Sequence, residues 1–401
     1  MIPFSEAYST VMKHSLEFEN ESVPLLEAVG RFLAEPVASP IDSPPFDKSA
    51  MDGFAIMPKD ESGEFEILET VAAGDKPQER LKPGSCIKIM TGAMLPEETG
   101  RVVRVEYTAE EAGRMRITTP EPYENIIRRG ENLKSGDEFM PVKRLGPGDI
   151  GSLAASGISR VMVKRRLRTA IITTGSELKE PGEPLAPGEI YNSNGYQLAC
   201  QIEAAGGEAV SYGIVADDPE LHAKVIRGAL EECDIVLLSG GVSKGEFDYV
   251  PDTLREAGVE ILIHGVKVKP GRPTLFGRGE NVFVFGLPGN PVSTFILFEV
   301  LVKPFIYHLN SVPFRPPVMQ GRLSQEIKRR DTERMEFRPV KLRHSDGPFD
   351  GIEATEARLI DPVRYMGSAH LNAMVETEGL ILMQPGVERI EEGSIVDVRL
   401  I

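Results

Sequence analysis

A short apolar run that ends in a Ser-Gly-Gly turn constrains the fold of this chain more than any other segment. Residues 235–238 are apolar, rich in β-branched residues and too few for a helix, so they predict a buried strand of a parallel sheet. The glycines of the following Ser239–Gly241 turn lack Cβ atoms, so backbone N–H groups can approach an anion closely. Glu246 and Asp248 follow at the carboxyl end of this strand, which is where open α/β sheets bind ligands. The segment therefore predicts either a phosphate site with a hard cation such as Mg²⁺, or a tight strand-to-helix turn with ordinary capping residues.

Two further segments repeat this strand-then-turn pattern. Residues 168–174 predict a strand, which a Gly-Ser-Glu turn ending at Glu177 follows. Residues 282–287 predict another, which a Pro-Gly-Asn-Pro turn and an apolar helix follow. Pro291 suits the first turn of that helix and would leave the preceding N–H groups free for an anion. Three such turns within one region favour an extended, phosphate-bearing ligand.

The order of predicted elements indicates an α/β protein with several domains. Residues 4–18 and 24–33 carry apolar residues at helical spacing, whereas strands and helices alternate after residue 168 and imply a parallel sheet covered on both faces. The predicted domains are a helical/linker domain (1–42 plus 142–167), a β-rich insertion (43–141), a central three-layer α/β domain (168–312) and a C-terminal β-barrel-like domain (313–401).

Charge and composition exclude several functional classes. The net charge of −16 argues against a nucleic-acid partner, because binding to phosphate backbones needs a basic surface. Cys86, Cys200 and Cys233 are an odd number and widely spaced, which argues against disulfides or a zinc site and suits a reducing compartment. The first twenty residues lack the apolar core of a signal peptide, and we expect no stretch long enough to span a bilayer. We therefore expect a cytoplasmic protein with no membrane partner.

Motifs along nearly the whole chain resemble those of one known family. The motifs are Ser49-Ala50-Met51-Asp52-Gly53, Met90-Thr91-Gly92-Ala93, Thr174-Gly175-Ser176-Glu177, Asp217-Asp218-Pro219, residues 239–249, Lys269-Pro270-Gly271-Arg272-Pro273, residues 286–293 and Gly367-Ser368. In content and order they resemble the molybdopterin molybdenumtransferases, the MoeA family, which is related to the E domain of gephyrin. Each motif alone is weak evidence, but the ordered set is specific.

The resemblance implies an enzyme of molybdenum cofactor biosynthesis. Such an enzyme inserts molybdate into adenylylated molybdopterin and releases AMP with the help of Mg²⁺, and its α/β domain binds the molybdopterin. The family is similar in forming a homodimer. Further partners would be the molybdopterin adenylyltransferase and the apoenzymes that accept the finished cofactor.

The resemblance also nominates site residues. The nominated catalytic residues are Asp52, Thr91, Glu177, Asp217 and Asp248, and of these Glu177, Asp217 and Asp248 would also hold Mg²⁺. The nominated substrate-binding residues are Ser239, Gly240, Gly241, Ser243, Lys269, Arg272, Pro288, Asn290, Pro291 and Ser368. Which carboxylate binds the metal and which acts on water does not follow from the sequence.

Local sequence offers plainer roles for several of these residues. Asp52 precedes Gly53 in a common turn pair, and Asp248 could be a carboxylate in the first turn of a helix. Asp218 is explained as a helix start, which makes Asp217 the better functional candidate of that pair. Lys269 could be a solvated charge at a strand end.

Three positions depart from the family pattern. Asn132 stands where members often have Asp, and its amide cannot carry the negative charge, while Gly265 stands where many have Lys. Pro339 stands where some have Arg, although Arg338 adjoins it and Arg334 is close. This leaves open which C-terminal residue contacts the oxyanion.

Three rival functions remain open, of which the adenylylating one resides on a fold similar to the central α/β domain alone. They are a gephyrin-like scaffold that binds a partner, a molybdopterin-adenylylating enzyme and a tungstate-inserting enzyme. The carboxylates named above argue against a pure scaffold, and the long flanking domains favour the insertion step over adenylylation. Because tungstate and molybdate are nearly isosteric, the sequence does not separate the two metals.

Overall fold

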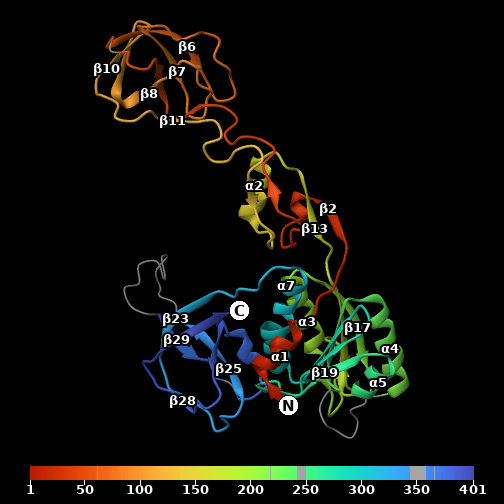
Figure 1. Ribbon diagram of the computed structural model, residues 1–401. Coiled ribbons are helices and arrows are strands. Elements are labelled where there is room, and N and C mark those ends of the chain that lie inside the picture. Colours follow the sequence, from red (N-terminus) through yellow and green to blue (C-terminus); the bar gives the residue numbers. More distant parts are fainter. Residues whose placement is uncertain (61, 217, 242–249, 344–357, 365) are drawn as a thin grey trace. The chain divides into compact units, whose positions relative to one another are not determined.

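The computed structural model describes residues 1–401 except 61, 217, 242–249, 344–357 and 365 (Figure 1). The described chain falls into two compact units. The first comprises residues 1–21, 30–34 and 163–401, and the second comprises residues 22–29 and 35–162. The four domains predicted above divide the chain more finely than these two units, and their boundaries stay a prediction.

A six-stranded sheet lies at the centre of the first unit. Its strands, in spatial order, are β17 (Glu208–Val215), β14 (Arg168–Thr174), β18 (Ile235–Ser239), β22 (Phe283–Leu287), β21 (Leu275–Arg278) and β19 (Glu260–His264). The first four pair in parallel, which confirms the predicted parallel sheet. β21 runs in the opposite direction because it forms a hairpin with β22.

Helices cover both faces of this sheet and make three layers. One face packs on α3 (Ser193–Ala204), α1 (Phe4–Val11) and the continuous helix formed by α6 (Pro291–Leu297), η3 (Phe298–Val302) and α7 (Lys303–Leu309). The other packs on α4 (Pro219–Glu232) and α5 (Val250–Glu256), seen together beside the sheet in Figure 1. Strand residues alternate between the two cores, since Ile171 belongs to the first and Ile172 to the second.

The helix over residues 291–309 corrects one expectation from the sequence. It is long and apolar enough to cross a membrane, so the expectation that no stretch has this length was wrong. However, 78% of its apolar 18-residue window is buried inside the structure. Its Phe298 and Phe305 are fully buried against the sheet, so it is the core helix of the α/β fold.

A second sheet of the first unit closes on itself. Within the described residues its order is β1 (Ile2–Pro3), β20 (Val266–Lys269), β25 (Met335–Leu342), β26 (Leu359–Pro362), β23 (Val318–Leu323), β29 (Ile395–Leu400) and β27 (Gly379–Met383). β25 also pairs with β27, so the strands from β25 to β27 form a ring around Val340, Ile360 and Val398. This confirms the predicted C-terminal barrel-like fold.

The second unit is mainly β-structure, as predicted. Its six-stranded sheet has the order β8 (Arg101–Arg104), β5 (Gly53–Ile56), β7 (Ser85–Ile89), β6 (Glu64–Val71), β10 (Arg114–Ile117) and β9 (Thr108–Glu111). Alternate residues of β5 enter two apolar clusters, with Ala55 in one and Phe54 in the other. The unit also contains α2 (Pro147–Ala155) and the 3₁₀ turn η2 (Val105–Tyr107).

Short two-stranded sheets complete the described fold. They are β2 (Asn20–Pro24) with β13 (Arg160–Lys164), β3 (Val37–Ala38) with β12 (Glu138–Met140), β4 (Lys48–Ser49) with β11 (Ile126–Ile127), β15 (Leu178–Lys179) with β16 (Ile190–Tyr191), and β24 (Ile327–Lys328) with β28 (Arg389–Ile390). A 3₁₀ turn, η4 (Leu371–Val375), precedes β27.

Two predicted N-terminal helices are shorter than expected. The helix predicted over residues 4–18 ends at Val11, because Leu16 and Phe18 pack on the α/β core without helical backbone. The helix predicted over residues 24–33 is only the 3₁₀ turn η1 (Leu25–Glu27). Gly30 has a φ of 78°, and Leu33 bridges to Val163, so tertiary contacts replace the helix that the apolar spacing suggested.

Candidate functional site

A cavity of 650 Å³ lies at the carboxyl edge of the parallel strands in the first unit. Its walls include Thr173 and Thr174 from the end of β14, Ser239 and Gly241 from the end of β18, and the Pro288–Pro291 turn after β22. Glu177, Tyr191 and Asn194 close further sides. The three turns predicted from the sequence therefore meet at one site, as expected for the carboxyl edge of an open α/β sheet.

The β14 and β18 turns approach so closely that only glycine fits between them. Gly240 has a φ of 97°, and a Cβ there would lie 2.6 Å from the carbonyl oxygen of Thr174. Gly175 has a φ of 148°, and a Cβ there would lie 2.5 Å from the carboxylate of Glu177. The Glu177 carboxylate thus folds over its own turn at the cavity wall, and bare backbone lines this edge.

Asn194 is a site residue that the sequence reasoning missed. It lies in the first turn of α3 with 9% of its surface exposed, and its Nδ2 donates to Ser239 Oγ and to the carbonyl oxygen of Gly289, both at 2.7 Å. Its Oδ1 and the hydroxyl of Thr174 are buried without a hydrogen-bond partner in the described structure. Asn192 already caps α3 by accepting from the Gly195 amide, so a second asparagine two residues later was the available signal.

The turn before α6 also contacts the C-terminal segment. Asn290 does not cap the helix, because its Nδ2 donates instead to Ser368 Oγ at 2.8 Å. The Val292 amide donates to the carbonyl oxygen of Ser368 at 3.0 Å. The Val292 amide follows Pro291, so this contact does not test the expectation that the N–H groups preceding Pro291 are free for an anion, and that expectation stays a prediction. Ala369 and Leu371 add to the cavity wall.

The predicted oxyanion-binding turn lies beside this cavity and contributes only one residue to its wall. Pro273 lines the cavity, whereas Lys269 and Arg272 do not. Arg272 is exposed, and Lys269 Nζ lies 3.2 Å from Glu336 Oε1. Gly271 packs so tightly on Leu297 that a Cβ would lie 2.5 Å from its Cδ1 atom. The turn is thereby fixed against the core helix.

In the second unit the structure joins two nominated catalytic residues. The Thr91 amide and hydroxyl both donate to Asp52 Oδ1, at 2.6 Å and 2.8 Å. These bonds, the backbone one foremost, hold the pKa of the exposed Asp52 carboxyl below its usual value. Gly53 sits where a Cβ would lie 2.2 Å from the Val103 carbonyl oxygen, so close packing against β8 requires glycine after Asp52.

Several nominated residues cannot be placed. Asp217, Ser243 and Asp248 lie outside the described residues, so of the three nominated magnesium ligands only Glu177 is described. Within the described ranges no group of three His, Cys, Asp or Glu side chains could hold a metal ion. Asn132 is exposed, and its amide donates to the Ser43 carbonyl oxygen at 3.0 Å.

A larger hollow of the first unit, 840 Å³, lies away from the strand-end turns. Tyr8, Leu16, Phe18 and Phe314 line it together with polar and charged residues, among them Glu17 and Lys164. None of the nominated residues that the structure describes lines it. Size therefore does not identify the functional site here, and the smaller cavity with the glycine turns is the better candidate.

Comparisons with known proteins agree with this placement. The family description "MoeA N-terminal region (domain I and II)" matches residues 2–157, "Probable molybdopterin binding domain" matches residues 170–308, and "MoeA C-terminal region (domain IV)" matches residues 320–401. A curated molybdopterin molybdenumtransferase from Staphylococcus epidermidis is 31% identical, with 100% of this chain and 95% of that protein covered. The chain belongs to the MoeA family of molybdopterin molybdenumtransferases.

Other relatives give the same result. A molybdopterin molybdenumtransferase from Nostoc sp. is 33% identical, with 97% of this chain and 90% of that protein covered. The crystal structure of a molybdopterin biosynthesis MoeA protein from Pyrococcus horikoshii OT3 superposes with a TM-score of 0.84 at 30% identity, covering 100% of both chains. This molybdenumtransferase is thus an enzyme of molybdenum cofactor biosynthesis, and the strand-end cavity lies mainly within the segment that matches a molybdopterin binding domain.

Proposed function

We propose that this molybdenumtransferase inserts molybdate into adenylylated molybdopterin in a Mg²⁺-dependent reaction that releases AMP. The observation that carries the proposal is the 650 Å³ cavity at which three glycine- or proline-containing turns meet the ends of β14, β18 and β22. Its bare backbone and hydroxyl groups suit phosphate oxygens, and its volume is of the size that small-molecule ligands occupy.

The described residues suggest how the substrate would bind. The Ser239–Gly241 and Pro288–Pro291 turns would hold the phosphate-bearing part of molybdopterin, and Asn194 fixes the two turns relative to each other. Lys269, Arg272 and Ser368 would hold molybdate beside the dithiolene sulfurs. Lysine and arginine supply a point charge and a planar pair of donors for such oxyanions.

Glu177, together with Asp217 and Asp248 from the sequence, would hold Mg²⁺. Magnesium usually binds one or two carboxylates together with substrate phosphates, so Glu177 at the wall of the phosphate cavity suits this role. The ion would offset phosphate charge while the phosphoanhydride bond to AMP breaks. We also propose that the protein is cytoplasmic and forms a homodimer. Size-exclusion chromatography with light scattering would test the oligomeric state.

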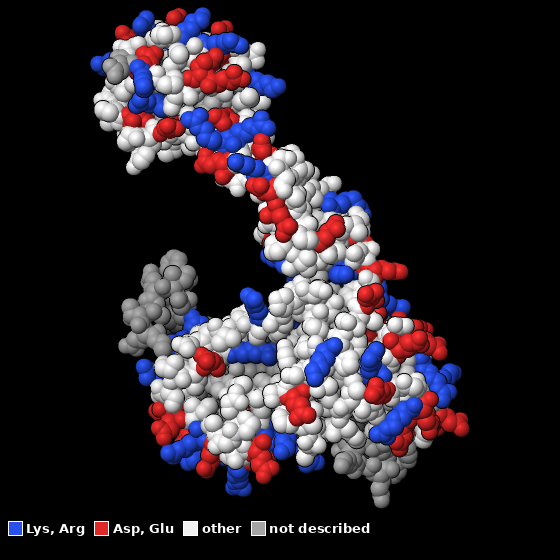
Figure 2. Space-filling view, viewed as in Figure 1, with Lys and Arg blue, Asp and Glu red and all other residues white. Residues whose placement is uncertain are grey.

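Charge is the main obstacle to binding two anionic substrates. The chain carries a net charge of −16, yet basic and acidic residues are interspersed on the face seen in Figure 2. Local cations and backbone amides must therefore overcome the overall field at the site. We expect substrate capture without strong long-range attraction and with a modest dependence on salt.

The deciding experiment incubates the purified protein with adenylylated molybdopterin, Mg²⁺ and either molybdate or tungstate. AMP and metallated cofactor are then measured by chromatography. We expect AMP only when an oxyanion and the divalent cation are both present. AMP release at the full rate without Mg²⁺ or another divalent cation would contradict the role of Mg²⁺. Tight binding of adenylylated molybdopterin without any AMP release would favour a scaffold. The two oxyanions compare molybdate with tungstate directly.

A further inference from the structure

A fully buried carboxylate lies among three cations at the start of β25. Glu336 Oε1 lies 3.2 Å from Lys269 Nζ and 3.3 Å from Arg338 Nη1, and Glu336 Oε2 lies 3.8 Å from Arg329 Nη1. The Glu336 side chain is 1% exposed, and Oε2 accepts no hydrogen bond in the described structure. Burial of a carboxylate is unfavourable unless nearby cations compensate its charge. Here three cationic side chains surround one carboxylate.

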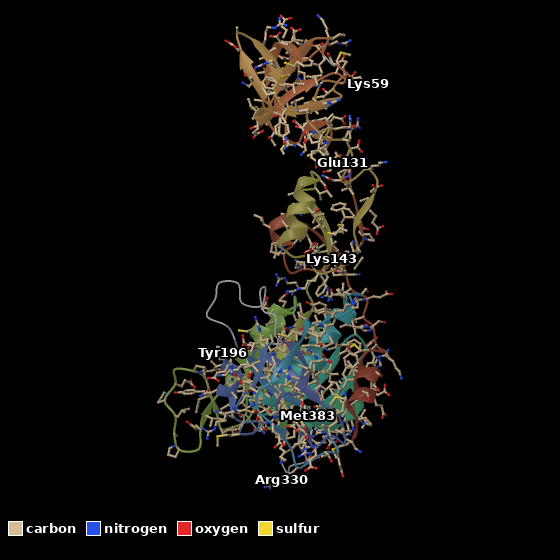
Figure 3. All side chains as sticks on the ribbon, turned by 90° about the vertical axis from the view of Figure 1, so that its left-hand side faces the viewer. Lys59, Glu131, Lys143, Tyr196, Arg330 and Met383 are labelled. Atoms are coloured by element: carbon tan, nitrogen blue, oxygen red, sulfur yellow. The ribbon has the colours of Figure 1, made fainter. Side chains whose placement is uncertain are left out.

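Glu336 links two parts of the first unit. Lys269 is the last residue of β20, which lies in the segment matched by the molybdopterin binding domain, whereas Glu336 lies in the segment matched by the C-terminal region. β20 pairs in parallel with β25, and the register places Lys269 directly opposite Glu336. On its other side Glu336 is opposite Met383 of β27, which is labelled in Figure 3. The glutamate is therefore held by strands on both sides.

The cations around Glu336 have different tasks. The Arg329 side chain is 1% exposed and donates to the carbonyl oxygens of Val387, Arg334 and Gln384, so it is a structural counter-charge. The Lys269 side chain is 33% exposed and starts the turn that reaches the cavity wall at Pro273. An ammonium group has three donors, so contact with Glu336 still leaves donors for a second anion.

We propose that Glu336 is a positioning residue that fixes the Lys269 ammonium for the oxyanion substrate. The side chain of lysine is long and loses much rotamer freedom when it binds an anion. Because the buried carboxylate opposite Lys269 already orders this side chain in the folded protein, part of the entropy is lost on folding. Less entropy is then lost when the oxyanion binds. This inference rests on the proposed function, because it assumes that Lys269 contacts the oxyanion.

The test measures oxyanion binding in Glu336→Gln, Lys269→Met and the double variant. Readouts are the KM for molybdate in the AMP assay and, independently of turnover, calorimetric binding of tungstate. Glu336→Gln should raise the molybdate KM about tenfold, as expected for loss of one ordered charge-assisted contact, with kcat at saturating molybdate changed less than about threefold. In the Lys269→Met background, Glu336→Gln should change the KM less than about twofold, because Glu336 acts through Lys269.

Two further variants separate this role from stability. Glu336→Asp keeps a negative charge beside buried Arg329 but shortens the side chain by one methylene, which weakens the contact with Lys269. This variant should therefore fold and show an intermediate KM for molybdate. Asp234→Asn is the matched control, since Asp234 pairs with Arg165 at 2.7 Å. Asp234 lies just before β18, at the amino end of that strand, whereas the cavity lies at its carboxyl end. It should lower the melting temperature without changing oxyanion affinity.

Three results would overturn the inference. The first is an unchanged oxyanion affinity in folded Glu336→Gln or Glu336→Asp. The second is a loss in Glu336→Gln that is fully retained in the Lys269→Met background. The third is a wild-type protein that neither releases AMP nor binds an oxyanion, which would overturn the proposed function as well. Normal AMP release with either of the first two results would leave the proposed function intact.

Discussion

The side-chain nitrogen Nδ2 of Asn194 lies 2.7 Å from the hydroxyl oxygen of Ser239. The same nitrogen lies 2.7 Å from the carbonyl oxygen of Gly289, so one side chain of α3 connects the turns that follow β18 and β22. A buried amide with both hydrogens committed has one orientation, which aims Oδ1 away from these partners. The distance between the two proposed phosphate-binding turns is therefore set by a residue outside both.

Replacement of Asn194 by Ala should therefore affect binding as well as stability. We expect a loss of about 1–3 kcal/mol in unfolding free energy and a KM for adenylylated molybdopterin raised at least about tenfold. The matched control is Asn310→Ala, because Asn310 is also a buried asparagine whose Oδ1 has no partner among the described residues, and it donates to the Ile306 carbonyl oxygen at the end of α7. Equal KM values in the two variants would show that Asn194 is only structural.

Glu177→Gln should lower turnover without unfolding the protein. The change keeps the shape of the side chain that folds over Gly175 and removes only its charge. We expect turnover to fall at least about 100-fold at fixed Mg²⁺, as for a positioned electrostatic group, with an almost unchanged melting temperature. Asp248→Asn should behave in the same way, although Asp248 lies outside the described residues.

The nearby Glu183→Gln serves as the control for Glu177. Glu183 is exposed and accepts from the Glu180 amide at 3.0 Å, so it is a carboxylate of the next turn that does not line the cavity. Activity in this control should equal that of the wild type. Full activity of Glu177→Gln across a magnesium titration would remove Glu177 from the proposed metal set.

The sequence was sufficient for those parts of the site that depend on local pattern. Parallel strands end at one edge of a sheet, so the strand pattern alone places the turns after Thr174, Ser239 and Leu287 together. Ser368 was nominated only through family resemblance, and 78 residues separate it from Asn290. Spacing alone contains no signal for the contact that joins such a pair.

The parts that the sequence did not reveal depend on long-range register. Nothing near Lys269 shows that β20 leaves its neighbours and joins the barrel opposite Glu336. The burial of Asn194 likewise depends on how α3 packs over two strand ends. The predicted helix over residues 24–33 failed for the same reason, since Leu33 pairs with Val163, which is far away in the chain.

Gly240→Ala should destabilise the protein far more than an ordinary glycine substitution in a turn. The new Cβ would lie 2.6 Å from the Thr174 carbonyl oxygen, and the φ of 97° is unfavourable for alanine. Gly182→Ala is the control, because Gly182 has a φ of 99° but no described atom within 4 Å of its Cβ position. Urea unfolding should show a loss of about 1 kcal/mol in the control and at least about 2 kcal/mol more in Gly240→Ala. Equal losses would contradict the close approach of the two turns.

Removal of the Thr91 hydroxyl should raise the pKa of Asp52. Hydrogen bonds from the amide and hydroxyl of Thr91 stabilise the Asp52 carboxylate, so its pKa in the folded protein lies below the ordinary 3.8. By linkage, the stabilisation that Asp52 contributes is present above pH 3.8 and is lost as the pH falls through the lowered pKa. Thr91→Val keeps the backbone bond and removes the hydroxyl bond, so the pKa should move part of the way back toward 3.8. An NMR titration of the Asp52 side-chain carboxyl carbon measures this shift directly, and the control is Thr99→Val, which removes a buried hydroxyl without a partner in the described structure. An Asp52 pKa that is the same in Thr91→Val and in the wild type would show that the hydroxyl bond does not hold the carboxylate in solution.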